Sequence, residues 1–373
     1  MDRKLASVQK IVNIEPIPSA DLIEKATVLG WEIVIGKKDN FKVGDLVVYI
    51  ETDSIVPERP EYEFLRDRKF RVRTIKLKKQ ISQGLVLPLS VLGNQYDTWH
   101  KVVEYQEGDD VTALIGVRKY DPEGDAEQKL IDEKVSRSKS KLTKFLSKYP
   151  WYRRIFMTKK SRGGFPKFIH KTDEDRIQLF PHICENEKDT IFSVTEKIDG
   201  QSGTWFLVKN HNRFLWFGEK YIFGVCSRNL YLPKPNNSSY WTVAKKYGIK
   251  KMLMNLIGDH EFVAIQGECV GPGIQKNKYK LEDYDMYVFN LVYPEWKIDN
   301  AFAKKTMENC GMKFVPILDN NFVLKSTIPE NVDYSKGKSV LVDGLREGVV
   351  VRNYEKNLSF KIINPEFLLK YEE

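Results

Sequence analysis

The chain of 373 residues lacks the features that mark membrane-spanning, secreted and cysteine-based metal proteins. It has no run of about 18 uncharged apolar residues, so we expect no transmembrane helix and no membrane partner. Residues 1–6 contain no apolar core of a secretory signal. The cysteines are few, lie far apart and form no C-x-x-C pair for zinc or redox chemistry: Cys184, Cys226, Cys269 and Cys310. We therefore expect reduced cysteines and a cytoplasmic or other reducing intracellular location.

Positive charge is present in excess, and it is confined to one segment. The chain has 60 Lys and Arg against 51 Asp and Glu, a formal charge of +9. Residues 134–162 hold eleven Lys or Arg and no acid, which leaves 9 − 11 = −2 for the rest. Three interpretations stay open: binding to a nucleic-acid backbone with aromatic stacking, a membrane-surface segment, or a solvated linker helix. The interleaved aromatic residues are Phe145, Tyr149, Trp151, Tyr152 and Phe156.

The length and the residue pattern predict an α+β protein of two domains joined by a linker. Residues 1–117 are rich in short alternating runs broken by turn residues, which favours a small β-barrel of the OB type with one short helix near 19–25. Residues 118–165 show no strand periodicity and are predicted to form a basic linker or insertion. Residues 166–373 alternate β runs with helical patches. The alternating runs of the first domain are 31–35, 45–50, 70–75 and 84–89.

One lysine has the surroundings of a nucleophile. Lys197 ends the apolar run 191–194 within Thr195-Glu-Lys-Ile-Asp-Gly200. A free lysine, with a pKa of about 10.4, is almost fully protonated at neutral pH, and only the neutral amine attacks. Partial burial and nearby cations, including a metal, would lower this pKa. A solvated lysine beside an Asp-Gly turn is the alternative.

Downstream segments supply groups that nucleotidyl transfer requires: cations for phosphate oxygens and carboxylates for Mg²⁺. Arg228 follows the run 221–225, and Glu268 closes the apolar run 262–265 before a glycine-rich segment. A loop arginine and an ordinary loop are the alternatives.

Two later β runs complete the set. Phe289 lies in the run 287–293, where an aromatic side chain stacks on a purine or simply fills a core. Glu347 stands at the start of an apolar run, and Lys361 lies on the next one. These two residues would serve as metal ligand and phosphate clamp, or form a plain cross-strand ion pair.

These motifs, in this order, resemble the covalent nucleotidyltransferase superfamily of RNA ligases, DNA ligases and capping enzymes. The chain is most similar to ATP-dependent RNA ligases with an N-terminal OB domain, the Deinococcus and Naegleria type. The resemblance spans nearly the whole chain except about 122–162. The matching segments are Lys197–Gly200, Ser227-Arg228, Gly267-Glu268, 287–289, Glu347-Gly348 and Phe360-Lys361, together with the phrases 41–50, 75–84 and 168–178.

The resemblance implies a role for each matching residue, with ATP and Mg²⁺ or Mn²⁺ as cofactors. Lys197 would carry AMP. The catalytic residues would also include Lys361, which would bind the α-phosphate, and Arg228, which would contact the ribose or the end of the RNA. The metal would be held, largely through its waters, by Asp199, Glu268 and Glu347. Many relatives have a second lysine two positions after or before Lys361, where this chain has Ile363 and Ser359; Lys370 would substitute. The nucleotide-binding set would be Arg176, Glu196, Arg228, Glu268, Phe289, Lys361 and Lys370.

The implied activity is joining of RNA 3′-OH and 5′-phosphate ends through lysyl-AMP and RNA-adenylate, at nicks in duplexes during RNA repair. The partner would be RNA, held by the OB domain and by segment 134–162, and the protein would be a monomer. DNA ligases and capping enzymes carry another OB domain after the last motif, whereas this chain ends twelve residues after Lys361; this favours RNA. A ligase that also seals DNA-containing nicks and a non-catalytic RNA-binding protein are the alternatives.

Overall fold

The computed structural model describes residues 4–93, 103–120, 164–211, 219–232, 235, 237–294 and 298–371. The basic segment 134–162 lies outside this part of the chain, so its predicted role remains a prediction. Within the described residues, no helix is both long and apolar enough to cross a bilayer.

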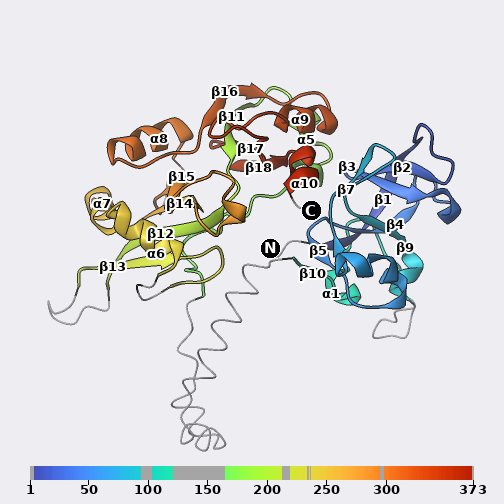
Figure 1. The fold of residues 1–373 in the computed structure, drawn as a ribbon, viewed down its shortest axis with the longest axis horizontal. Coiled ribbons are helices and arrows are strands. Elements are labelled where there is room, and N and C mark those ends of the chain that lie inside the picture. The colour runs from blue at the N-terminus through green and yellow to red at the C-terminus, as the bar shows by residue number, and fades with distance from the viewer. Residues whose placement is uncertain are drawn as a thin grey trace, which may run out of the picture.

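The N-terminal region is built on a five-stranded antiparallel sheet in the order β3-β2-β1-β4-β9, drawn in blue and cyan in Figure 1. Smaller sheets in the order β10-β5-β6 and β7-β8 complete it, which agrees with the predicted β-rich barrel. Its strands are β1 (Ala6–Pro16), β2 (Ile23–Val28), β3 (Trp31–Gly36), β4 (Leu46–Ile50), β5 (Ser54–Ile55), β6 (Arg71–Val72), β7 (Ile75–Leu77), β8 (Gln80–Ser82), β9 (Leu85–Pro88) and β10 (Arg118–Lys119).

The short helix predicted near 19–25 is wrong. This stretch contains a turn and the start of β2, which pairs with β1 on one side and β3 on the other. Lys25 projects across the sheet to Glu15 at 2.6 Å and Glu32 at 3.1 Å, so its charge is matched by neighbouring strands and not by helical neighbours. The β structure also continues past the predicted boundary at 117, because β10 pairs with β5.

The C-terminal region contains two four-stranded antiparallel sheets, in the orders β16-β11-β17-β18 and β13-β12-β14-β15. The predicted α+β class is therefore correct. The strands are β11 (Ile191–Lys197), β12 (Gln201–Lys209), β13 (Tyr221–Cys226), β14 (Phe262–Val270), β15 (Asp285–Val292), β16 (Ile317–Val323), β17 (Gly348–Asn353) and β18 (Leu358–Ile363).

Helices cover these sheets with one apolar side. In α7 (Ile249–Leu256) the buried residues Ile249, Met252 and Leu253 follow the i, i+3, i+4 spacing of an amphipathic helix. They share a core with Trp205 of β12. The remaining α-helices are α1 (Thr112–Ile115), α5 (Ile183–Asn186), α6 (Ser239–Lys246), α8 (Asn300–Asn309), α9 (Ile328–Ser335) and α10 (Pro365–Tyr371); the 3-10 helices are η1 (Lys37–Asp39), η2 (Pro60–Arg68), η3 (Leu89–Leu92), η4 (Ile177–Leu179) and η5 (Gln275–Asn277).

Two features of this architecture position the site. The chain passes from one C-terminal sheet to the other in the three residues 198–200, between β11 and β12. The N-terminal region also contacts the segment before β11, since the Gly30 amide donates to the Gln178 carbonyl at 3.0 Å. Figure 1 shows that region beside α10 and β18.

Candidate active site

A cavity of about 460 Å³ lies where the two C-terminal sheets and the N-terminal region meet. It is large enough for a nucleotide-sized ligand. The N-terminal region contributes Asp53, Arg71, Lys119 and Tyr120 to its lining. Nine of the ten predicted site residues line it as well: Arg176, Glu196, Lys197, Asp199, Arg228, Glu268, Phe289, Glu347 and Lys361.

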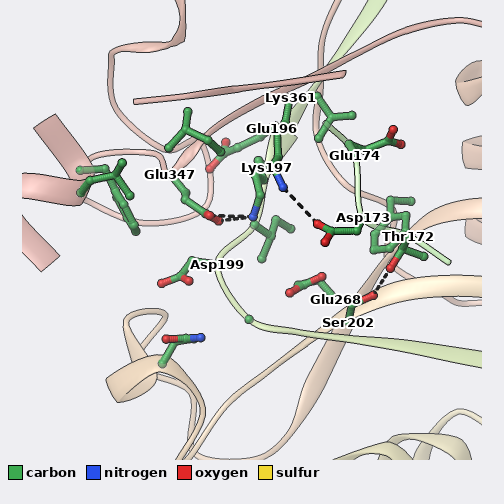
Figure 2. Close-up of a pocket in the computed structure, with 18 of the residues that line it drawn as sticks. Thr172, Asp173, Glu174, Glu196, Lys197, Asp199, Ser202, Glu268, Glu347 and Lys361 are labelled. Carbon is green, nitrogen blue, oxygen red and sulfur yellow. Dashed lines mark hydrogen bonds and ion pairs between the residues drawn. The ribbon is translucent and has the colours of Figure 1, made fainter. Parts of the chain in front are cut away.

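Lys197 points into this cavity and binds Glu347 (Figure 2). Its Nζ donates to both carboxylate oxygens of Glu347, at 2.7 and 2.6 Å. The pairing of β11 with β17 sets this contact, because Lys197 stands opposite Gly348 in the register. Lys197 is thus three-quarters buried and paired, and it is not a solvated lysine.

The protonation of Lys197 differs from the prediction. Burial does lower its pKa, but the carboxylates of Glu347, Glu268 and Asp199 raise it by more, so the pKa lies above its usual value. The sequence predicted a lowered pKa from partial burial and nearby cations. The structure instead places acids nearest to the amine, so Lys197 is an ammonium ion in the ligand-free protein.

The three predicted metal residues surround Lys197 from three elements, as Figure 2 shows. Glu268 lies within β14, which runs on to Val270, and does not end the strand as predicted. Burial raises the pKa of Glu268 to about 8; the attraction of Lys197 opposes this, while Glu347 and Asp199 add to it. The carboxylates therefore exceed the cations available to them, which suits a divalent ion.

The donor set fits a hard metal that keeps its water. In the part of the chain that the structure describes, no group of three His, Cys, Asp or Glu side chains is close enough to ligate a metal directly. Mg²⁺ commonly retains several waters and is held by one or two carboxylates. Asp199, Glu268 and Glu347 would thus hold it largely through those waters.

Gly200 allows the loop of Lys197 and Asp199 to lie against β14. A Cβ at this position would lie 2.3 Å from the Cys269 carbonyl oxygen and 2.9 Å from Cγ of Glu268. Only glycine permits such a close approach of two backbones. The turn glycine of the motif is therefore a packing requirement that fixes the carboxylates around the lysine.

The two predicted phosphate-binding cations meet at a carboxylate that the sequence did not single out. Lys361 Nζ lies 3.1 Å and Arg228 Nη2 lies 2.8 Å from Asp173. Lys119 binds the same carboxylate at 2.5 Å. Burial alone would raise the pKa of Asp173, but Lys361, Arg228 and Lys119 hold it well below its usual range. The cross-strand pair of Glu347 with Lys361, considered from the sequence, is replaced by the pairs Lys197–Glu347 and Lys361–Asp173.

Arg176 stands between the two regions. It is 4% exposed, and its Nη2 donates to Asp53 of the N-terminal region at 2.8 Å. Its guanidinium lies 5.5 Å from the Trp31 ring, and its Nε and Nη1 are buried with no hydrogen-bond partner. A buried guanidinium at a cavity wall with unused donors is suited to an anionic ligand.

Glu196 and Phe289 also line the cavity. Glu196 is buried, and its carboxylate accepts a hydrogen bond of 2.9 Å from the Val340 amide. Arg352 lies 5.9 Å from the Phe289 ring, so a cation covers the aromatic residue expected to stack on adenine. Both side chains are thus held by contacts other than those predicted for the nucleotide.

Lys370 is the exception among the predicted residues. It is exposed near the end of α10, lies 5.0 Å from the Tyr371 ring and does not line the cavity. The lysine that does enter the site is Lys278, which pairs with Asp199 and lies 4.3 Å from the Phe367 ring. The sequence analysis did not single out Lys278.

Comparisons with known proteins agree with this geometry. A family model for an OB-fold domain matches residues 5–89, and one for RNA ligase matches residues 190–371. A search of curated proteins finds no match.

Solved structures of Naegleria gruberi RNA ligase resemble the whole chain. One of them, in the apo form, is 29% identical, covers 99% of this chain and 98% of its own, and has a TM-score of 0.75. Another, with AMP and Mn, matches at 29% identity, 99% of both chains and a TM-score of 0.75. A third, with ATP and Mn, covers 100% of both chains at 29% identity and a TM-score of 0.76.

The order of motifs, the double sheet around one lysine and these full-length matches agree. The chain therefore carries an OB-fold domain followed by an RNA ligase domain, and it resembles Naegleria gruberi RNA ligase over its whole length.

Proposed function

We propose that this ligase joins RNA 3′-OH and 5′-phosphate ends through lysyl-AMP and RNA-adenylate intermediates, acting at nicks in duplexes in RNA repair. One observation carries the proposal: a single cavity holds a lysine bound to a carboxylate, two further carboxylates, and the cations Lys361 and Arg228. The chain thus supplies the nucleophile, the carboxylates and the cationic side chains that nucleotidyl transfer from ATP requires.

In the first step, Nζ of Lys197 attacks the α-phosphorus of ATP. An N–P bond forms, the bond from the α-phosphorus to the bridging oxygen breaks, and pyrophosphate leaves. The amine must first lose a proton, and the Glu347 carboxylate at 2.6 Å is placed to hold it. Bound Mg²⁺ or Mn²⁺ would supply positive charge beside the acids and the phosphate oxygens.

The other side chains bind and orient the nucleotide. Lys361 and Arg228 neutralise phosphate oxygens, and Phe289 covers the adenine on one side of the cavity. In the next step an RNA 5′-phosphate oxygen attacks the AMP phosphorus and releases the Lys197 amine. Attack of a 3′-OH on the resulting RNA-adenylate then forms the phosphodiester and releases AMP.

The domains divide the work as the sequence suggests. Residues 1–117 would bind RNA, residues 166–373 would carry out adenylation, and residues 118–165 would link them. Segment 134–162, with its eleven basic residues, would add contacts to the phosphate backbone. The protein would act as a monomer in a reducing compartment, which its four free cysteines favour.

Incubation with α-labelled ATP and Mg²⁺ tests the central step. We expect label to remain on the denatured protein, and to be absent from Lys197→Ala, because Lys197 is the amine to which the proposal assigns the attack on ATP. A wild-type protein that gains no label, or a labelled Lys197→Ala variant, would refute the proposal and favour a non-catalytic RNA-binding protein.

Nicked duplexes with RNA or DNA on the 3′-OH side test the substrate. We expect sealing of the RNA nick to be much faster, since the 2′-OH is what distinguishes the two ends chemically. Equal rates would show a ligase of broader polynucleotide specificity.

A further inference from the structure

Asp173 is the point in the cavity where three cations from three parts of the chain converge. Lys361 comes from β18, Arg228 follows β13, and Lys119 comes from β10 of the N-terminal region. One carboxylate thus faces three positive charges. Figure 2 shows Lys361 reaching Asp173 beside Lys197.

The backbone around Asp173 is fixed on both sides. Thr172 and Ser202 share a hydrogen bond of 2.7 Å, and Glu174 forms an ion pair of 3.2 Å with Arg352. The Lys361 amide donates to the Asp175 carbonyl at 2.8 Å. These contacts of the neighbouring residues hold the Asp173 carboxylate against the cations.

Two of the three cations are those that the proposed function assigns to the substrate's phosphate, and the inference rests on that assignment. A phosphate approaching Lys361 and Arg228 meets a carboxylate that already forms an ion pair with each of them. Like charges in one site repel, so the carboxylate and the phosphate cannot share both cations without a cost. Asp173 must lose these two partners when phosphate binds.

Lys119 gives the displaced carboxylate a remaining partner. Its side chain is 33% exposed, against 12% for Lys361 and 40% for Arg228. Lys119 is the cation of the three that the proposed function does not assign to phosphate, and at this exposure its ion pair with Asp173 carries a smaller desolvation cost than a fully buried pair would. A buried charge left with no partner would be far more costly.

We propose that Asp173 is an internal competitor of the substrate's phosphate: its carboxylate holds Lys361 and Arg228 before the nucleotide binds, and remains paired with Lys119 when phosphate takes the other two. Asp173 is a positioning residue, since it acts through these cations. It keeps these cations oriented at the cost of weaker phosphate binding.

Calorimetric titration with inorganic pyrophosphate and Mg²⁺ tests this without relying on turnover. Asp173→Asn should bind pyrophosphate about tenfold more tightly than the wild type, because no charged competitor is left on the cations. Its melting temperature should nevertheless fall, since three ion pairs are lost. Asp173→Glu should restore the wild-type affinity. The matched control is Asp333→Asn. This change removes the surface ion pair between Asp333 of α9 and Lys336, and it should leave the affinity for pyrophosphate unchanged.

Lys119→Met should have the opposite effect, weakening pyrophosphate binding about threefold, because Asp173 then loses its remaining partner. In the Asp173→Asn background the same change should have no effect. If Lys119 instead binds the phosphate directly, Lys119→Met will weaken pyrophosphate binding in both backgrounds. That result would overturn this part of the proposal.

An Asp173→Asn variant that binds pyrophosphate as tightly as the wild type, or more weakly, would overturn the inference. The Asp173 carboxylate would then have a purely structural or a metal-binding role. Failure of the wild type to become labelled by ATP is a separate result. It would refute the ligase reaction while tighter pyrophosphate binding by Asp173→Asn still supported the competition.

Discussion

The charge state of Lys197 shows how opposing local effects decide the chemistry of one side chain. Burial favours the neutral amine, and three carboxylates favour the ammonium ion; the carboxylates prevail. Lysine adenylation thus requires more than a pocket. Under the proposed function, a divalent metal held by these acids would offset their charge and so favour the neutral amine, in addition to supplying positive charge at the phosphates.

Glu268 should make the stability of the ligand-free enzyme depend on pH. Its pKa rises from an ordinary 4.5 to about 8 on folding, so the folded state binds more protons than the unfolded state between these values. The free energy of unfolding should therefore fall as pH rises through that window. Glu268→Gln should flatten the dependence, as measured by urea unfolding at several pH values. An unchanged slope in the variant would contradict the raised pKa.

Most of the site could be predicted from residue types in order along the chain, because its motifs carry chemistry at fixed positions. Asp173 and Lys278 could not be predicted in the same way. Their functions depend on which cations or acids the fold brings to them, and Asp173 meets Lys119 from 54 residues earlier. Lys370 was predicted to bind the nucleotide, but its position near the end of α10 leaves it exposed and outside the cavity lining.

At the scale of elements, the short connection between two sheets decides the geometry of the site. Residues 198–200 join β11 to β12, so one tight loop ties the nucleophile on the first sheet to the acids facing it. Longer strands such as β17 and β18 could be predicted from their apolar runs. The helix near 19–25 could not be excluded, because the cross-strand partners of Lys25 are invisible to local patterns.

Gly200→Ala should damage catalysis more than folding. The new methyl would meet the Cys269 carbonyl at 2.3 Å, a backbone atom that cannot rotate away, so the loop must shift. A displacement near 1 Å at reacting groups costs about a hundredfold in rate. We expect lysine labelling by ATP to slow by about that factor with a modest fall in melting temperature.

Gly164→Ala is the control for this substitution, because its new Cβ would have no heavy atom within 4 Å. It should keep the wild-type labelling rate. Equal rates for Gly200→Ala and the wild type would show that the loop tolerates the shift.

At the scale of the whole molecule, the N-terminal region forms part of the wall of the catalytic cavity. Asp53, Arg71 and Lys119 line it, and Asp53 pairs with the buried Arg176. The sequence predicted two domains and a linker but not this contact, which joins residues more than a hundred positions apart. Long-range contacts of this kind depend on how two finished surfaces fit, and local patterns do not encode that fit.

Gly30→Ala should weaken the docking of the two regions. The new Cβ would lie 2.5 Å from Cδ1 of Ile328 and 3.0 Å from Cα of Gln178, so side chain and backbone would both have to move. We expect the free energy of unfolding to fall by about 1–3 kcal/mol. Thermal and urea unfolding measure this change.

Gly36→Ala, in the same sheet, is the matched control. Its Cβ would lie 2.9 Å from the Asp39 carboxylate and 3.5 Å from Cγ of Lys38, and both belong to exposed side chains that can rotate away. Its stability should stay within about 0.5 kcal/mol of the wild type. Equal losses in both variants would show that the effect belongs to the sheet and not to the contact.

The ion pair between Lys197 and Glu347 also bears on unwanted chemistry. Neutral amines attack acylating and carbonyl reagents, whereas the ammonium form of Lys197 has no lone pair with which to do so. The ligand-free protein therefore protects this amine from such electrophiles, and under the proposed function the amine would become reactive only once metal and nucleotide have bound.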